Sequence, residues 1–391
     1  MTETDIAQTT AVTALAAYLE ATAKPHVQSP YRGALSPREF DAPAVEMAAL
    51  TTGAAVHDLG WMRRVAVRGE DRFRWLSGMV TNAVNELGEN SGAWNLVLNA
   101  QGRILGDLYV WRDRDELELA IAADQYEKLV THLERFIVMD DVELATQDEE
   151  TALALRGTKA DEVLERLSLP ALAEPMTGAR VEWNGIDLRL LRGYGALGPN
   201  YELWAAAAVV GKIWKYLLAA GAMPVGTTSV EAFRIAEGIP AYGVDMSEKY
   251  LAQETSQMRA LNFNKGCYLG QEVVERVRSR GQVHRHLRQL ELTGPVPASE
   301  TELALEDGTA AGQIGSAAEI ALASGNRVLA LGMIRGDAEA KKQVLRYAVG
   351  EVKGSARILD GAVGIAACGE SQVVKGHDSS RAVSAAKPTR L

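Results

Sequence analysis

The feature that most constrains the fold is a structural unit that the sequence carries twice. In the first copy, residues 65–69 alternate as a strand ending in glycine, and a helix with one apolar face follows. Residues 153–157 repeat that strand and glycine, again before a helix. A later strand in each copy, at 117–122 and at 201–204, precedes a second amphipathic helix. The repeat predicts an α+β fold of two paired subdomains, whose antiparallel sheets are covered by helices and enclose a ligand cleft.

Short strands replace this unit towards the C-terminus. Residues 287–292, 312–317 and 327–334 read as strands separated by glycine-rich turns, with two more at 346–349 and 363–367. This spacing predicts a small β-barrel. The first expected segment, 1–44, holds an N-terminal helix within 5–23 and a linker at 25–43. It is followed by a first α+β subdomain (45–150), a second α+β subdomain (151–285), the barrel (286–374) and a disordered tail (375–391).

Composition narrows the class of protein. A chain of 391 residues is too long for one ordinary core, so two or three domains are expected. The net charge of -10 argues against duplex nucleic acid as a partner, because phosphate binding needs a basic surface. The chain starts without a basic signal-peptide region and has no apolar window of membrane-spanning length. Its two cysteines give no disulfide framework or metal-ligand spacing, so we expect a cytoplasmic location and no membrane partner.

One of those cysteines lies in the most distinctive stretch, residues 264–272, which read NKGCYLGQE. Lys265 favours the thiolate form of Cys267, because a nearby cation stabilises the charged thiol. This makes Cys267 a candidate nucleophile or redox centre; the alternative is a glycine turn holding a small buried hydrophobe. Cys368 lies in an apolar segment and is expected to be buried and inert. The other motif residues are Gly266, Tyr268, Gly270, Gln271 and Glu272.

The run KGCYLGQE resembles the signature of the YgfZ family, and a weaker likeness extends over about 45–370. These folate-binding proteins are related to the T protein of glycine cleavage (GcvT), support iron–sulfur enzymes and include mitochondrial iron–sulfur assembly factors. The resemblance implies a T-protein-like fold with tetrahydrofolate, or a one-carbon derivative, between the subdomains. It also implies that Cys267, activated by Lys265, lies near the mouth of that site, and that iron–sulfur client proteins are partners. Our hypothesis is a transient thiol bond to a folate-borne carbon or a client's sulfur.

The same resemblance assigns folate contacts. Residues 57–62 resemble a family segment whose last residue, a Met, touches the folate, and Asp107 retains the second acid of a family Asp pair. A carboxylate can accept two parallel N–H bonds from a pterin, which suits Glu202. Without the resemblance, Trp94 and Tyr194 are more often core aromatics, Glu202 a solvated strand carboxylate and Asp107 a turn or strand-end acid. The residues implied are Met62, Trp94, Asp107, Tyr194, Glu202 and Arg234.

Departures from the transferase pattern favour the YgfZ type. Transferases carry two arginines four residues apart, of which the first is thought to grip folate; here the positions hold Val230 and Arg234. We interpret Arg234 and Asp245 first as structural ion partners. Two alternatives stay open: a folate-dependent aminomethyltransferase or demethylase with Asp107 as its acid–base group, and a folate-binding scaffold without chemistry of its own.

A basic run at 275–288 follows the cysteine motif. Two interpretations are open. The run forms a positively charged rim around the thiol, or it is a strand whose alternating charged side chains are solvated. His284 and His286 are two apart, but no Cys or acid completes a ligand set in sequence, so no metal site is predicted.

Overall fold

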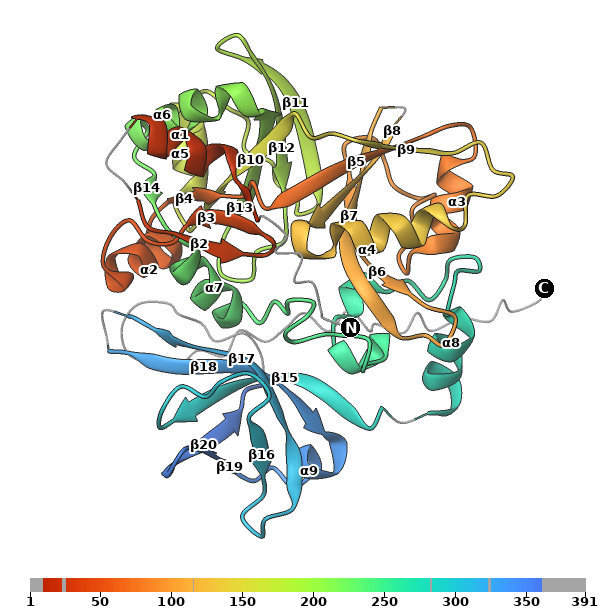
Figure 1. Cartoon of the computed structure of the whole chain (residues 1–391), viewed down its shortest axis with the longest axis vertical. Helices are drawn as coiled ribbons and strands as arrows, with labels where there is room; N and C mark the ends of the chain where they lie inside the picture. The colour runs from red at the N-terminus through yellow and green to blue at the C-terminus, as the bar shows by residue number, and fades with distance from the viewer. Residues whose placement is uncertain (1–9, 23–25, 115, 282, 323–324, 361–391) are drawn as a thin grey trace, which may run out of the picture.

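The computed structural model describes residues 10–22, 26–114, 116–281, 283–322 and 325–360. Two large sheets lie side by side above a closed β-barrel (Figure 1). The predicted α+β class, with antiparallel sheets and a C-terminal barrel, is confirmed. Among the described helices, none has the length and apolar character that crossing a membrane requires.

The first sheet has five strands, each paired antiparallel with its neighbour, in the order β6-β7-β8-β5-β9. Helices α3 (Arg72–Met79) and α4 (Ala123–Glu134) pack on it through Leu76, Leu129 and Leu133, which are fully buried. The strands are β5 (Met62–Arg68), β6 (Gly92–Leu98), β7 (Ile104–Asp113), β8 (Glu116–Ala122) and β9 (Glu143–Thr146).

The second sheet has six strands in the order β11-β12-β13-β10-β4-β14 and is covered by α5 (Ala160–Arg166), α6 (Val210–Ala219) and α1 (Ala14–Thr22). Glu118 of the first sheet forms buried ion pairs with Arg64 of its own sheet and Arg189 of the second. The pair between Glu118 and Arg189 links the two sheets. The strands are β11 (Thr177–Trp183), β12 (Ile186–Arg192), β13 (Asn200–Ala206), β10 (Glu150–Arg156), β4 (Ala55–Asp58) and β14 (Met223–Pro224).

Strand β4 pairs with β10 of the second sheet, although the sequence placed its residues with the first subdomain. All four of its residues are buried, which suits a strand inside a covered sheet. The chain then crosses to the first sheet at β5. This crossover brings residues 57–62 to the junction of the two sheets.

The segment expected as a linker at 25–43 contains strands. Strands β2 (Gln28–Tyr31) and β3 (Ala34–Pro37) form a hairpin, and β1 (Ala11–Val12) adds to β3 in parallel. The turn places Arg32 and Gly33 at φ of 49° and 87°, a left-handed conformation that glycine adopts readily. Buried Ala34 and Ser36 hold β3 against the rest of the molecule, and α2 (Pro43–Thr52) follows.

Six strands close the barrel in the order β15-β18-β17-β16-β19-β20. The sequence missed β16 and β20, because β16 has three residues and β20 reads VKGSARI, with little alternation of apolar residues. The expected strand at 363–367, Cys368 and the tail at 375–391 lie outside the described residues. The elements are β15 (Arg285–Thr293), β16 (Glu302–Ala304), β17 (Ala310–Ile320), β18 (Arg327–Arg335), α9 (Gly336–Ala340), β19 (Leu345–Val349) and β20 (Val352–Ile358).

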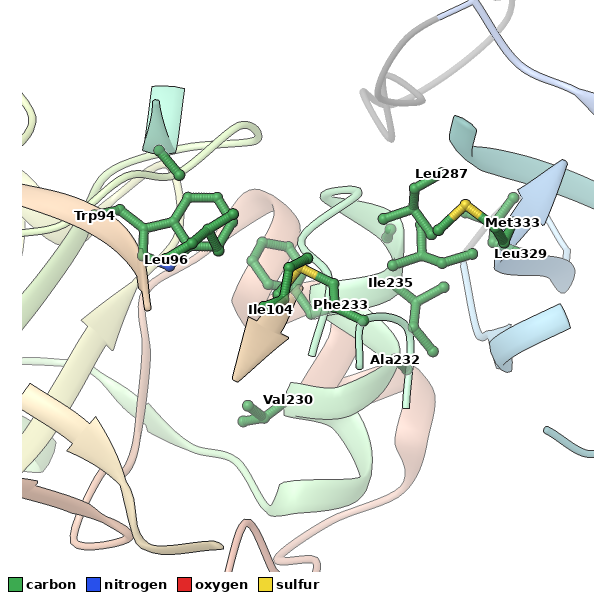
Figure 2. Packing of buried hydrophobic residues seen from close by; sticks show 14 of the residues in the cluster. Trp94, Leu96, Ile104, Val230, Ala232, Phe233, Ile235, Leu287, Leu329 and Met333 are labelled. Atoms are coloured by element: carbon green, nitrogen blue, oxygen red, sulfur yellow. The ribbon is translucent and has the colours of Figure 1, made fainter. Parts of the chain in front are cut away.

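Helix α7 (Thr227–Ala236) lies between the sheets and the barrel (Figure 1). Its Ile235 points towards Leu287 and Met333 of the barrel, while Val230 lies on another side of the helix (Figure 2). The ion pair expected between Arg234 and Asp245 is confirmed, with 2.7 Å between Nη1 and Oδ2. Ser316 Oγ of the barrel donates to the other oxygen of Asp245 at 2.7 Å. The packing of α7 thus ties the sheets to the barrel.

The strand interpretation of the basic run was wrong for its first part, because residues 271–280 form helix α8 (Gln271–Arg280), whereas its last residues, 285–288, lie in strand β15. Gly270 precedes it at φ 83°, where an added Cβ would lie 2.5 Å from the Asn99 carbonyl oxygen. His286 Nδ1 lies 2.7 Å from Glu339 Oε2. Within the described ranges, no cluster of three or more His, Cys, Asp or Glu side chains could hold a metal ion. The remaining short helices are η1 (Ala207–Val209), η2 (Ala252–Thr255) and η3 (Met258–Ala260).

Candidate functional site

A pocket lies between the two sheets and under the N-terminal hairpin. The space inside it that a water-sized molecule can reach is about 120 Å³, and the pocket opens to solvent at its mouth. Strands β6, β7 and β8 supply one wall, β4, β10 and β13 supply the other, and α7 closes one end. The structure brings all six side chains assigned by the resemblance to this pocket: Met62, Trp94, Asp107, Tyr194, Glu202 and Arg234.

The wall from the first sheet presents the carboxylate of Asp107. The indole Nε1 of Trp94 donates to Asp107 Oδ2 at 2.9 Å, and Gln125 Nε2 donates to Oδ1 at 3.1 Å. Burial raises the pKa of Asp107, and the positive charge of Arg32 partly offsets this rise. Tyr109, paired with Trp94 across the strands, stacks on it with ring centroids 6.3 Å apart.

The opposite wall repeats this arrangement around Glu202. Trp204, two residues along the same strand face, donates its indole Nε1 to Glu202 Oε2 at 2.8 Å. Burial raises the pKa of Glu202, against the lowering effect of this hydrogen bond and of Arg156. Arg156 in turn donates to Asn200 Oδ1 at 2.8 Å. Each wall therefore carries one half-buried carboxylate oriented by an indole.

His57 and Asp58 occupy strand β4 at the junction of the sheets. Burial, and then the charge of Arg156, lowers the pKa of His57 to about 3. Burial raises the pKa of Asp58 to about 6, although Thr13 Oγ1 and the Gly60 amide donate to its carboxylate. At neutral pH the imidazole is therefore uncharged.

The N-terminal hairpin covers the pocket with two side chains. Tyr31 donates its hydroxyl to Glu231 Oε2 at 3.1 Å, and its ring meets Trp61 edge to face at 5.4 Å. Arg32 donates to Asp124 Oδ2 at 2.9 Å, and its positive charge lies near Asp107. Because this hairpin was expected as a linker, its contribution was not predicted.

Arg234 is fully engaged by protein groups. Besides Asp245, it bonds the carboxylate of Glu231 and the Ile239 carbonyl oxygen. A separate cation, Arg259, lies over the ring of Tyr194 at 3.7 Å and over Trp94 at 5.0 Å. Arg259 thus covers the two aromatic residues at this side of the pocket.

The cysteine motif lies apart from the pocket lining. Lys265 Nζ donates to the carbonyl oxygens of Ser77, Val80 and Asn82 at 2.6, 2.7 and 2.7 Å. Burial lowers the pKa of Lys265 to about 8. Cys267 is exposed and is not among the residues that line the pocket. These three hydrogen bonds link Lys265 to the end of α3 and to the residues that follow it. The sequence analysis did not predict this contact.

Sequence reasoning missed several polar residues of the site: Arg32, His57, Gln125, Arg156 and Trp204. Of these, Trp204 could have been predicted from the sequence. It lies two residues from Glu202 on a predicted strand, and residues two apart on a strand lie on the same face. Gln125, Arg32 and Arg156 reach the site through pairings between segments distant in the chain. No local pattern reports such pairings.

The fold and this pocket define a T-protein-like α+β protein with a ligand site between its sheets. Residues 10–265 match the GCVT N-terminal domain family, and the chain belongs to that family. The chain is similar in structure to the glycine cleavage system aminomethyltransferase T from Bartonella henselae. That likeness has a TM-score of 0.81 and 17% identity, and covers 91% of this chain and 98% of that one. At this identity it shows a shared fold.

Two sequence relatives are informative. A chloroplastic protein of Arabidopsis thaliana, whose name proposes a transferase, is 26% identical over 266 residues, 67% of this chain and 62% of that protein. The match thus spans less than two thirds of that relative's length. An aminomethyltransferase of Thermoanaerobacter pseudethanolicus is 26% identical over 266 residues, 64% of this chain and 71% of the relative.

Proposed function

We propose that this protein binds tetrahydrofolate, or a one-carbon derivative of it, in the pocket between the two sheets. The observation that carries the proposal is the pair of half-buried carboxylates, Asp107 and Glu202, each bonded by an indole and lining one pocket. Aminomethyltransferases of this family use tetrahydrofolate, which supports the same ligand for this pocket. The carboxylates would accept N–H groups of the pterin, while Met62 and Tyr109 supply apolar surface.

We further propose a YgfZ-type role, in which the folate-bound protein supports the assembly or repair of iron–sulfur clusters in client enzymes. The motif KGCYLGQE supports this, because its cysteine is exposed and separate from the pocket. Such a thiol is accessible to a partner protein. A single described thiol is too few to hold a cluster, which takes about four cysteine ligands, so any cluster would need an outside thiol.

The position of Val230 also supports the YgfZ type over the transferases. Val230 lines the pocket where transferases are expected to carry a folate-gripping arginine, and it is 5% exposed. Apart from Arg234 of α7, which is bonded by protein groups, the arginines that line the pocket are Arg32 on the hairpin and Arg156 on β10. The pocket therefore lacks an arginine at position 230 of α7, where transferases are expected to bind folate, and its arginines are arranged differently.

Aminomethyl transfer is the second candidate, and the placement of Asp107 favours it. This carboxylate lines the pocket and has a raised pKa, as expected of a group that exchanges a proton near neutral pH. The curated relatives named aminomethyltransferase agree with it. This function predicts turnover of a methylamine-type donor by the purified protein. It also predicts a much larger loss from Asp107→Asn than from Cys267→Ser.

Calorimetric titration tests the main proposal. The native protein, Glu202→Ala and Cys267→Ser are each titrated with tetrahydrofolate and its 5,10-methylene and 5-formyl forms. We expect Glu202→Ala to weaken binding at least about tenfold, because a charge-assisted hydrogen-bond pair is lost. Cys267→Ser is expected to bind as the native protein does, since Cys267 does not line the pocket.

The outcomes separate the candidates. Absence of binding by the native protein would refute the folate proposal. If folate binds, the next measurement is the activity of iron–sulfur enzymes in cells that carry each variant. Loss of that activity with Cys267→Ser favours the YgfZ-type role. If iron–sulfur enzyme activity is full with Cys267→Ser but lost with Glu202→Ala, the protein is instead a folate-binding scaffold.

A further inference from the structure

His57 carries a buried hydrogen-bonding atom that the described part of the chain leaves unsatisfied. The residue is 3% exposed, and its Nδ1 lies 2.9 Å from the carbonyl oxygen of Asp58. Because a carbonyl oxygen can only accept, Nδ1 carries the proton. The other nitrogen, Nε2, is then an acceptor, and it has no hydrogen-bond partner among the described residues. Buried polar atoms in folded proteins are nearly always paired with protein, water or ligand, and His57 lines the pocket, so a ligand there can supply the missing donor.

Strand register places that imidazole on the pocket face. His57 on β4 is opposite Ala154 on β10, and Ala154 is opposite Glu202 on β13. Directly opposed residues of neighbouring strands lie on the same face of a sheet. All three residues line the pocket. His57 and Glu202 therefore form one row on the wall, with a single residue between them.

The middle position of this row leaves space for a ring. Neighbouring strands are about 4.8 Å apart, so the backbones of His57 and Glu202 are about 10 Å apart. Ala154 contributes only a methyl group between them. A flat bicyclic ring can therefore lie over Ala154 with a hydrogen-bond acceptor at each end, the Glu202 carboxylate and His57 Nε2.

The protonation state of His57 fixes its role. Its pKa is lowered by burial and by Arg156, while the other charged groups that line the pocket are Arg32, Asp107, Glu202 and Arg234. The imidazole is neutral throughout the physiological range. A base with so low a pKa takes up a proton poorly, so His57 acts as a hydrogen-bond acceptor and not as a general base.

We propose that His57 Nε2 accepts a hydrogen bond from a ring N–H of a reduced pteridine, and so makes the pocket select reduced over oxidised folates. This inference rests on the proposed folate binding. With the pyrimidine edge of the pteridine at Glu202, the second ring extends over Ala154 towards His57. In tetrahydrofolate both nitrogens of that ring carry hydrogen. In folic acid both are imine nitrogens with lone pairs, which oppose the lone pair of Nε2.

The test is the ratio of dissociation constants for folic acid and tetrahydrofolate. The ratio is measured by calorimetry under anaerobic conditions for the native protein and for His57→Phe, which keeps a ring of similar size without the acceptor. We expect His57→Phe to weaken tetrahydrofolate binding about tenfold and folic acid binding little, so that the ratio falls about tenfold. His132→Phe is the matched control, because His132 lies on α4 outside the pocket lining. Its ratio should stay unchanged.

Ala154→Val provides a second test that leaves His57 in place. It narrows the space between His57 and Glu202, so both ligands should bind at least about tenfold more weakly. This variant decides the question if His57→Phe fails to fold. Native-like binding by Ala154→Val would then overturn the inference.

The outcomes also separate this inference from the proposed function. Suppose that the native protein binds tetrahydrofolate and that His57→Phe keeps the native ratio of dissociation constants. Then His57 does not distinguish reduced from oxidised pteridines, and the proposed folate binding is unaffected. If the native protein binds neither ligand, the proposed function and this inference both fall.

Discussion

His57 and Asp58 are adjacent and buried, and burial shifts their pKa values in opposite directions. The pKa of His57 falls from 6.5 to about 3, so below pH 6.5 the unfolded chain binds a proton that the native state does not. This lowers stability as the pH falls. The pKa of Asp58 rises from 3.8 to about 6, so between pH 6 and 4 the native state holds the extra proton. This raises stability as the pH falls, and the two effects offset each other.

Single substitutions should expose each effect. From pH 6.5 to 4.5, the free energy of unfolding of His57→Phe should rise relative to the native protein by about 2 kcal/mol. That of Asp58→Asn should fall relative to the native protein by about 2 kcal/mol over the same range. Urea unfolding followed by tryptophan fluorescence at several pH values measures both differences. Profiles that run parallel to the native one would show that neither group titrates as stated.

At the scale of elements, the Lys265 side chain fastens the cysteine motif to the end of helix α3. Its ammonium donates to three backbone carbonyls, and a cation is favourable at the C-terminal end of a helix. Lys265→Met should therefore lower the free energy of unfolding by about 2 kcal/mol, because buried carbonyls lose a charged donor. Chemical denaturation checks this value. Lys249→Met is the control, since the Lys249 ammonium pairs with Glu300 at the solvent-exposed surface and its loss should change stability by less than about 0.5 kcal/mol. Equal stabilities for the two variants would contradict the anchoring role.

The elements themselves could be predicted where they follow a local period. Val65 and Val67 alternate on a strand, and Leu129 and Leu133 recur at helical spacing, so β5 and α4 were correctly predicted. The hairpin β2–β3 was missed because proline and serine obscure its alternation. The pairing of β4 with β10 joins distant segments, and no local period reports that.

The site was predictable to the same extent. Six lining residues came from the family resemblance, and the structure gathers them in one pocket. His57 did not stand out, because a lone histidine beside an aspartate has no distinctive spacing. Its meaning depends on strand register, through Ala154 to Glu202. Lys265 was assigned to thiol activation from its proximity in sequence, whereas its donors bond carbonyls of a segment far back in the chain.

At the scale of the whole molecule, the barrel is coupled to the pocket through one buried carboxylate. Asp245 accepts from Arg234, which lines the pocket, and from Ser316 of β17. Gly315 lies at an irregularity in the pairing of β17 with β18. A Cβ added there would lie 2.5 Å from Asp245 Oδ1 and 3.2 Å from the Val244 carbonyl oxygen. The barrel can therefore approach this closely only with glycine at position 315.

Gly315→Ala should accordingly move the barrel away from Asp245 and disturb Arg234 at the pocket. We expect a loss of about 1–3 kcal/mol in unfolding free energy, the usual cost of overpacking, together with weaker tetrahydrofolate binding. Thermal unfolding and calorimetric titration measure the two effects on the same sample. Gly78→Ala is the control: it lies in helix α3, its added Cβ meets no heavy atom within 4 Å, and alanine favours helices. If Gly315→Ala destabilises the protein while its affinity for tetrahydrofolate stays native, the barrel supports the fold alone, and the coupling through Asp245 to the pocket is wrong.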